Sequence, residues 1–398
     1  MALDKLKHPP LLAFCGFSGS GKSTLLSKLV QSLSARGSRV GYLKHAGHGF
    51  MIDQPGKDTD RLRQSGARTV LIHHAAQTAV LHSHAPRWGE FESAFADCHV
   101  LLVEGHKGLP LPKVVLLDQA GDMLRALQAE QPSAIEALVG PEALPSEALP
   151  PALQHVPYFQ RDDLAAIEAF VRGYFARQLQ RPLYGLLLAG GYSTRMGRDK
   201  ALLNYHGQPQ LLHLQALLQA HCEHSFVSCR PQQWQDWSKT LGPESLASLN
   251  PLYDRFLDFG PFSGLLTALQ HQRQADWLVV ACDLPRLSAA VLQQLIQAHS
   301  SEIVALRSPL ATAFSSAHDG LPEPLCTLYT PAMYPRLLQF LGQGYTCPRK
   351  VLLNSPVQLL PLPAGMTDAL DNANHPEDFE RYRQTPVSGQ PSFPQGEA

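Results

Sequence analysis

The sequence lacks a charge bias of either sign, and charged residues are sparse in it. Its 398 residues carry a formal net charge of -1, and 17% of them are Asp, Glu, Lys or Arg. A protein that attracts nucleic acid through its overall field is strongly basic, so we expect no nucleic-acid partner. Any binding of phosphate must therefore come from local groups.

Long apolar runs are also missing. No run reaches the roughly 18 residues that a membrane span needs, so we expect no membrane partner. The short apolar stretch in MALDKLKHPPLLAFCGF leads into a glycine loop rather than a small-residue cleavage site, which argues against secretion. We expect a cytoplasmic protein.

Cysteine is scarce and scattered. The seven cysteines form no C-x-x-C pair and are odd in number, a pattern that favours reduced, mostly buried thiols over a disulfide framework or a zinc site. Histidine, in contrast, occurs 18 times, and its positions include His73, His74, His82 and His84. We interpret the histidines mainly as surface or edge-strand residues rather than as a metal cluster.

The composition that is present predicts a globular α/β protein of two or three domains. Hydrophobic residues make up 44% of the chain, which excludes a disordered protein. Residues 11–43 read as strand, glycine loop, helix and strand, and further short strands predict an α/β first half with some antiparallel hairpins. From Tyr184 the alternation restarts and predicts a doubly wound, mostly parallel, Rossmann-like sheet.

The boundary between the two halves is less obvious. Residues 140–157 are rich in proline and alanine and resemble a linker. The amphipathic pattern at 158–179 can nevertheless close the first domain, so we place the join at 179–183. The prediction is a first domain at 10–178, a second at 184–384, and a disordered tail at 385–398.

The first glycine loop, GFSGSGKS from Gly16 to Ser23, fits G-x-x-x-x-G-K-[ST] in full. Its glycines let backbone N–H groups face a phosphate chain, Lys22 adds a positive charge, and Ser23 offers a hydroxyl to Mg²⁺. Glu104 directly follows an apolar strand, where a P-loop protein keeps an acidic group for magnesium. The alternative is a strand-end acid that merely faces solvent.

The order of segments in the first half resembles the MobB-type adaptor of molybdopterin guanine dinucleotide synthesis, over about residues 10 to 178. The P-loop is followed by KHAGHGFMIDQPGKDT, RQSGARTVL and LLVEGHKGLPLPKV. The resemblance implies GTP binding, with Glu104 on the magnesium side. It also implies these phosphate-binding positions: Gly19, Ser20, Gly21, Lys22, Ser23 and Thr24. The segment AGHGFM after Lys44-His45 departs from the histidines and acids usual in the family.

The second glycine loop, LLLAGGYSTRMGRDKALL, is of another design because no G-K-[ST] closes it. Backbone amides of 189–191 can approach a base or ribose, while Arg195 and Lys200 can reach an anionic chain. Asp254 precedes a Gly-Pro turn. Asp283 ends an apolar strand, where a carboxylate is a natural magnesium ligand. A helix N-cap formed by Asp283 or Ser288 is the alternative.

These segments resemble the MobA-type molybdenum cofactor guanylyltransferases over about residues 183 to 384. L-A-G-G-x-S-x-R-M-G-x-D-K, G-P-x-x-G and C-D-x-P occur in the expected order, and NANHPEDF resembles the closing segment. The resemblance implies transfer of GMP from GTP to Mo-molybdopterin, with Mg²⁺ as cofactor. The implied catalytic residues are Arg195, Lys200 and Asp283. The implied GTP-binding residues are Leu188, Ala189, Gly190, Gly191, Lys200, Asp254 and Asp283. Asn372 and Asn374 lie on the implied pterin side.

Two departures from the family keep alternatives open. Ser228, Cys229 and Arg230 stand where an asparagine usually helps to read guanine, and Glu323 stands in a usual His-Pro pair. Gly190-Gly191 favours guanine over cytosine. The alternatives are a CMP-transferring pterin enzyme, a sugar-phosphate nucleotidyltransferase, and a non-catalytic GTP-binding carrier. Besides GTP and Mo-molybdopterin, the expected partners are molybdoenzyme apo-proteins or their chaperones.

Overall fold

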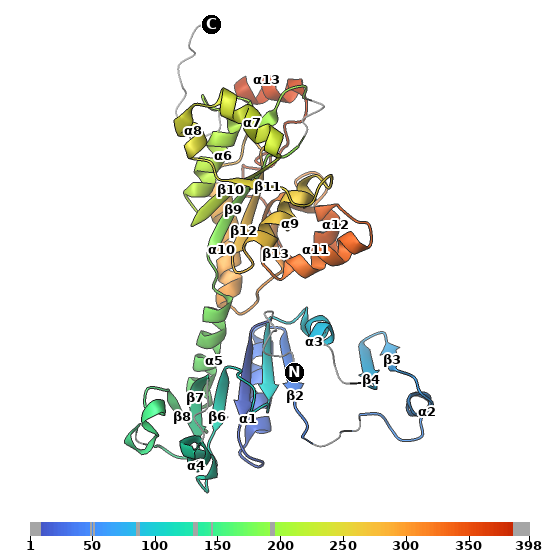
Figure 1. Cartoon of the computed structure of the whole chain (residues 1–398), viewed down its shortest axis with the longest axis vertical. Coiled ribbons are helices and arrows are strands. Elements are labelled where there is room, and N and C mark those ends of the chain that lie inside the picture. Colours follow the sequence, from blue (N-terminus) through green and yellow to red (C-terminus); the bar gives the residue numbers. More distant parts are fainter. Residues whose placement is uncertain are drawn as a thin grey trace. The chain divides into compact units, whose positions relative to one another are not determined.

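The computed structural model describes residues 9–47, 50, 52–84, 88–129, 134–144, 146–191 and 196–384. The chain divides into two compact units, Met1–Gln178 and Leu179–Ala398 (Figure 1). The predicted disorder of 385–398 lies outside the described residues. Among the helices that the structure describes, none combines the length and the apolar character needed to cross a membrane.

The first unit is built on a six-stranded sheet whose strands all run parallel. In sheet order they are β2 (Val40–Lys44), β5 (Val100–Glu104), β1 (Leu11–Cys15), β6 (Lys113–Leu116), β7 (Ile135–Gly140) and β8 (Tyr158–Gln160). The helices are α1 (Lys22–Ala35), α2 (Asp58–Gln64), α3 (Trp88–Phe95), α4 (Asp122–Ala129) and α5 (Leu164–Leu179). Strands β1 and β5 are buried along their whole length, as expected of central strands covered on both faces.

Helix α1 follows directly from the first glycine loop. Its buried residues are Leu25, Leu26, Leu29 and Leu33, a spacing that places them on one face of a helix. This face packs on the sheet, which fixes the start of α1 at the carboxyl end of β1. The phosphate loop is therefore anchored by the core on both sides.

A separate antiparallel hairpin is formed by β3 (Thr69–His74) and β4 (Gln77–His82). The sequence predicted both strands and an antiparallel hairpin in this half. Nearly every residue of the two strands is exposed. The pair has no third strand among the described residues.

The proline- and alanine-rich segment 140–157 is not a linker. It contains two short 3-10 turns, Ser146–Ala148 and Pro151–Leu153, between β7 and β8. Leu149, Leu153 and Val156 are buried in one cluster with Leu138 of β7. The composition was misleading because the prolines shape a crossover whose leucines still reach the core.

The second unit contains a seven-stranded sheet with strands that are parallel except for β14. In sheet order they are β11 (Pro251–Tyr253), β10 (His224–Cys229), β9 (Leu183–Leu188), β12 (Asp276–Ala281), β14 (Pro322–Tyr329), β13 (Ala311–Ser315) and β15 (Gln358–Leu360). This confirms the predicted class, a doubly wound and mostly parallel sheet.

Helices cover both faces of this sheet (Figure 1). One face packs against α6 (Gln210–Gln219), α7 (Pro231–Thr240) and α10 (Ala289–Val304). The other packs against α9 (Pro261–His271), α11 (Met333–Gly342) and α12 (Pro348–Leu353). The remaining helices are α8 (Pro243–Ala247) and α13 (Pro376–Gln384).

The motif G-P-x-x-G has a packing explanation in α9. A Cβ on Gly264 would lie 2.4 Å from Ser228 Oγ and 2.5 Å from Leu188 Cδ2. The start of α9 therefore lies directly against the carboxyl ends of β9 and β10, closer than any side chain at this position would allow. The glycine brings the helix to the strand ends where the second loop begins.

Candidate functional site

The second glycine loop leaves the sheet between two parallel neighbours. Ala189 N donates to Ser228 O at the end of β10 (3.0 Å), and Cys282 N donates to Leu188 O (3.1 Å). The carboxyl ends of β9, β10 and β12 thus meet at one edge. Ligands bind at this edge in open α/β sheets.

Three residues that the sequence singled out meet at this edge. Lys200 Nζ donates to Asp283 Oδ2 (3.2 Å) and to Asn374 Oδ1 (2.6 Å). The side chains of Lys200 and Asp283 are 15% and 20% exposed, so the pair is partly shielded from water and its electrostatic interaction is stronger than at an exposed site. Ala373 N donates to Asp283 O (2.9 Å), which fixes the closing segment against β12.

Asp283 has a second carboxylate oxygen that fits a cation. Oδ1 is buried and has no hydrogen-bond partner among the described residues. A buried carboxylate oxygen without a donor is costly unless something positive binds it, and Mg²⁺ takes carboxylate oxygens. The alternative N-cap role of Asp283 is wrong, because α10 begins at Ala289 with Ser288 as its N-cap.

Asp254 lies against the glycines of the second loop. Ser228 Oγ donates to Asp254 Oδ1 (2.7 Å), and a Cβ on Gly190 would lie 3.1 Å from Asp254 Oδ2. Burial raises the pKa of the Asp254 carboxyl, while the Ser228 hydrogen bond and the charge of Arg230 oppose the rise. Arg230 Nε in turn donates to Gly190 O (3.1 Å).

The second loop is held in place by residues that no sequence motif revealed. Gln233 Nε2 donates to Ala189 O (2.8 Å) and to Asp199 Oδ2 (3.1 Å), and Trp237 Nε1 donates to the same carboxylate oxygen (2.8 Å). Asp199 also accepts from Ala201 N (3.1 Å) and so caps the turn that carries Lys200. The aspartate of the R-D-K segment is therefore a positioning residue for the lysine.

Of two further predicted positions in the second loop, the structure describes one. Gly191 is exposed at the end of the described part of the loop. Arg195 lies outside the described residues, and its assignment stays a prediction.

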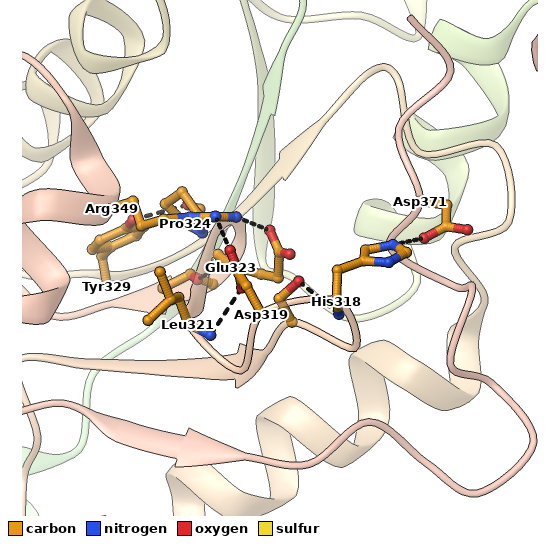
Figure 2. Close-up of polar contacts among 10 residues, drawn as sticks. His318, Asp319, Leu321, Glu323, Pro324, Tyr329, Arg349 and Asp371 are labelled. Atoms are coloured by element: carbon orange, nitrogen blue, oxygen red, sulfur yellow. Dashed lines mark hydrogen bonds and ion pairs between the residues drawn. The ribbon is translucent and has the colours of Figure 1, made fainter.

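Glu323 lies in a charged cluster beside the β13–β14 turn. Arg349 donates to Asp319 Oδ2 and to Glu323 Oε2, at 3.0 Å each (Figure 2). The guanidinium thus bridges one carboxylate of the turn and one of β14. Glu323 stands where the resembled family usually has a histidine, and Arg349 offsets part of the negative charge of the two carboxylates.

A second contact ties the same turn to the closing segment. His318 Nε2 lies 2.9 Å from Asp371 Oδ1, apart from the Arg349 group (Figure 2). The hydrogen bond with Asp371, and then the charge of that carboxylate, raise the pKa of His318. The next residue, Asn372, is exposed and makes no hydrogen bond to the other described site residues. Of the two predicted asparagines, only Asn374 joins the Lys200 cluster.

In the first unit the P-loop holds its lysine close to the loop backbone. Gly19 and Gly21 have φ of 76° and 85°, values that favour glycine. Lys22 Nζ donates to Gly16 O (3.0 Å) and Phe17 O (2.7 Å). The ammonium therefore lies inside the loop that a phosphate chain would occupy. Ser20 is buried, while Ser23 and Thr24 at the start of α1 are exposed.

Glu104 is the centre of a polar cluster beside the P-loop. It is 5% exposed, so the alternative of an acid that merely faces solvent is wrong. Ser23 Oγ lies 3.0 Å and 3.1 Å from its two oxygens, Tyr42 Oη donates to Oε2 (2.5 Å), and Lys44 Nζ lies 3.4 Å from Oε1. Burial opposes ionisation, but the bonds from Tyr42 and Ser23 and the charge of Lys44 together lower the pKa of Glu104.

Arg161 is a further residue at the P-loop that the sequence did not reveal. It follows β8, and its Nη2 donates to Leu117 O, just after β6 (2.7 Å). Its Cδ lies 3.5 Å from the position of a Cβ on Gly21, and its Nε is buried without a hydrogen-bond partner in the described chain. The guanidinium thus crosses the carboxyl ends of three strands to reach the phosphate loop.

The geometry of the two sites defines a nucleotidyltransferase unit and a P-loop nucleotide-binding unit. The family model described as MobA-like NTP transferase domain matches residues 185–358. The family model described as molybdopterin guanine dinucleotide synthesis protein B matches residues 11–140. The two matches fall in different units of the structure.

Relatives of each unit support the same division. A molybdenum cofactor guanylyltransferase of Xanthomonas euvesicatoria is 33% identical over 205 residues, which are 51% of this chain and 95% of that protein. The molybdopterin-guanine dinucleotide biosynthesis adapter protein of Escherichia coli is 39% identical over 120 residues, or 28% of this chain and 68% of that protein. The chain belongs to the molybdenum cofactor guanylyltransferase family through its second unit and to the MobB adapter family through its first.

A third relative is named as a bifunctional protein. A molybdenum cofactor biosynthesis bifunctional protein of Synechocystis sp. is 40% identical over 200 residues, which are 50% of this chain and 53% of that protein. The match therefore spans about half the length of that relative.

Proposed function

We propose that this protein transfers GMP from GTP to Mo-molybdopterin, forming Mo-molybdopterin guanine dinucleotide and pyrophosphate. Family membership of the second unit supports the reaction class. The observation that carries the proposal is the cluster of Lys200, Asp283 and Asn374 at the carboxyl edge of the sheet. A cation and a carboxylate with an unbonded oxygen are the groups that this reaction needs at its phosphates.

The chemistry requires positioning more than proton transfer. The terminal phosphate monoester of molybdopterin has a second pKa of about 6, so it is mostly a dianion at neutral pH. One of its oxygens attacks the α-phosphorus of GTP, the bond from that phosphorus to the α,β-bridging oxygen breaks, and pyrophosphate leaves with the electron pair. The site must align the two phosphates and neutralise their charge.

Lys200 and Asp283 divide this work between them. Lys200 is proposed to neutralise the phosphate oxygens as charge shifts to the leaving pyrophosphate. Asp283 would hold Mg²⁺ through Oδ1, and the bound ion would supply further positive charge beside the phosphates. Arg195 is proposed to add a second cationic side chain.

Gly190 and Asp254 are proposed to select guanine. Guanine presents two adjacent donors, N1–H and N2–H, on its base-pairing edge, and an ionised carboxylate is an acceptor only. Cytosine places the acceptor N3 on that edge. Because Gly190 has no side chain, the carboxylate of Asp254 can stand beside the loop backbone. Leu188, Ala189 and Gly191 complete the nucleoside side, and Asn372 and Asn374 the pterin side.

The first unit is proposed to bind a second GTP as an adaptor. Lys22 would leave the loop carbonyls for the phosphates, which offer it a charged acceptor in place of two neutral ones. Ser23 and Glu104 would hold Mg²⁺ on the other side of the loop. Arg161, whose side chain lies beside Gly21, is proposed to cover the ribose or base.

The two units are proposed to act as separate domains, 10–178 and 184–384, joined at 179–183. The product would pass to a molybdoenzyme apo-protein or its chaperone.

The test is pyrophosphate release by the purified full chain with Mo-molybdopterin and Mg²⁺, comparing GTP, CTP and ATP. We expect release with GTP alone, its loss on chelation of the metal, and its loss in Asp283→Asn. Asp236→Asn, on the exposed surface of α7, is the matched control and should behave as wild type. Preference for CTP would move the substrate to the cytidine analogue. If Mo-molybdopterin binds and no nucleotide is turned over, the second unit is a carrier of Mo-molybdopterin rather than a transferase.

A further inference from the structure

Three side chains of metal-ligating types lie together in the first unit, and none of them belongs to either proposed nucleotide site. His82 ends β4, His84 follows two residues later, and Glu90 is in the first turn of α3. One ligand atom from each lies within 4.8 Å of the others. None of the three takes part in the reaction proposed above.

The two histidine rings lie side by side. His82 is the last residue of β4, the chain bends at Ser83 and His84, and the two rings are stacked with their centroids 5.2 Å apart and an interplanar angle of 16°. Thr69, which faces His82 across the hairpin, places its hydroxyl 3.1 Å from Nδ1. That contact orients the ring and leaves its Nε2 for a metal, as the outer partners of metal-bound histidines do.

The distances are close to those of a bound zinc ion. Ligands about 2.1 Å from a tetrahedral metal lie about 3.4 Å from one another. His84 Nε2 and Glu90 Oε1 are already 3.5 Å apart. The His82 ligand atom lies within 4.8 Å of the other two, so it needs to approach by up to about 1.4 Å, a shift that an exposed side chain makes by rotation.

We propose that His82, His84 and Glu90 form a zinc site with water as the fourth ligand. Two imidazoles and one carboxylate are a donor set that Zn²⁺ accepts. The site modifies the interpretation that the histidines of this region are only surface residues. It is independent of the transfer of GMP.

The hairpin explains what such a site would do. A two-stranded pair is marginally stable by itself in water, and β3–β4 exposes large apolar side chains, among them Leu71 (61%) and Ile72 (55%). A metal shared by β4 and α3 links these two elements directly. It thereby holds the hairpin to the helix and lowers the entropy of its open states.

The experiment is a titration of the chelator-treated full chain with Co²⁺, followed by displacement with Zn²⁺. We expect one equivalent to give the visible absorption of four-coordinate Co²⁺, and Zn²⁺ to abolish it. His82→Ala and His84→Ala should each weaken the affinity at least tenfold. His73→Ala and His74→Ala, on the opposite strand of the same hairpin, are the matched controls and should bind as wild type.

A second measurement separates the site from general binding to histidines. Zn²⁺ should slow proteolysis within 69–84 several-fold in the wild type and in His74→Ala. It should give no protection in the double variant His82→Ala/His84→Ala. Equal metal affinity in the His82 and His74 variants would overturn the proposal, as would wild-type protein that shows no absorption at stoichiometric Co²⁺. Protection of the double variant would overturn it as well.

Discussion

The ammonium group of Lys200 lies 3.2 Å from Asp283 Oδ2, although 83 residues separate the two in the chain. Asn374 closes the same cluster from a still more distant segment. One partner follows β9 and the other follows β12, and these two strands are parallel neighbours. The sheet therefore assembles the proposed catalytic pair at its ligand edge.

Replacing Lys200 by methionine should lower kcat/KM for GTP about 100-fold. Loss of one group aimed at developing charge typically costs about 3 kcal/mol of transition-state stabilisation. The change should fall mainly on kcat, measured by pyrophosphate release. Lys239→Met, on the exposed surface of α7, is the control. A wild-type kcat in Lys200→Met would remove the lysine from the mechanism.

Adding a methyl group at Gly190 should weaken the preference for GTP. The new Cβ would stand 3.1 Å from Asp254 Oδ2, so the carboxylate must move away from the loop. We expect kcat/KM for GTP to fall about tenfold, a loss of about 1.4 kcal/mol, and the ratio of CTP to GTP use to rise. Gly242→Ala, where a Cβ meets no atom within 4 Å, is the control. An unchanged ratio would show that Asp254 does not read the base.

Arg161→Ala should weaken GTP binding at the P-loop about tenfold, because the side chain beside Gly21 is lost. Calorimetry on the full chain should resolve two GTP sites, and Lys22→Ala identifies the one at the P-loop. Arg36→Ala, in an exposed ion pair next to α1, serves as the matched control. The GTP site that remains in Lys22→Ala is the one in the second unit. If Arg161→Ala weakens only that site, the assignment of Arg161 to the P-loop is wrong.

Gly264→Ala should destabilise the second unit by about 1–3 kcal/mol, the range for overpacking a buried position. The added Cβ would meet Ser228 Oγ at 2.4 Å, so α9 must move away from the strand ends. Urea unfolding measures the effect. Gly342→Ala, near the end of α11 with open space around it, should be neutral. Equal stability of the two variants would contradict the close approach of α9 to the sheet.

Stability of the second unit should fall as the pH drops below about 6.5. Burial, and then the neighbouring His206, lower the pKa of His213 to about 4; the two rings are stacked 3.8 Å apart. Between pH 6.5, the ordinary pKa of histidine, and pH 4, His213 binds a proton in the unfolded chain but not in the native chain. The contribution of neutral His213 to stability is therefore fully present above pH 6.5 and is lost as the pH falls toward 4. The expected loss from His213 is about 2 kcal/mol at pH 5. Urea unfolding at pH 7 and pH 5 should show a smaller difference in His213→Gln.

Local patterns predicted much of the fold. The pattern of strand, glycine loop, helix and strand over 11–43 predicted α1, and alternation of strands and helices predicted the doubly wound second unit. Segment 140–157 resembles a linker by composition alone, because composition records prolines but not whether Leu153 finds a core. Burial of that leucine depends on β7, and composition contains no information about such contacts.

The sequence by itself determined that the chain carries two glycine loops of different design, because each depends on glycines and basic residues close together in the chain. It also determined which acids follow apolar strands. Only the tertiary structure decided that Lys200 meets Asp283, that Asp199 positions the lysine, and that Arg161 lies over the P-loop. These contacts join residues far apart in sequence, and strand order and packing, rather than local propensity, bring them within hydrogen-bonding distance.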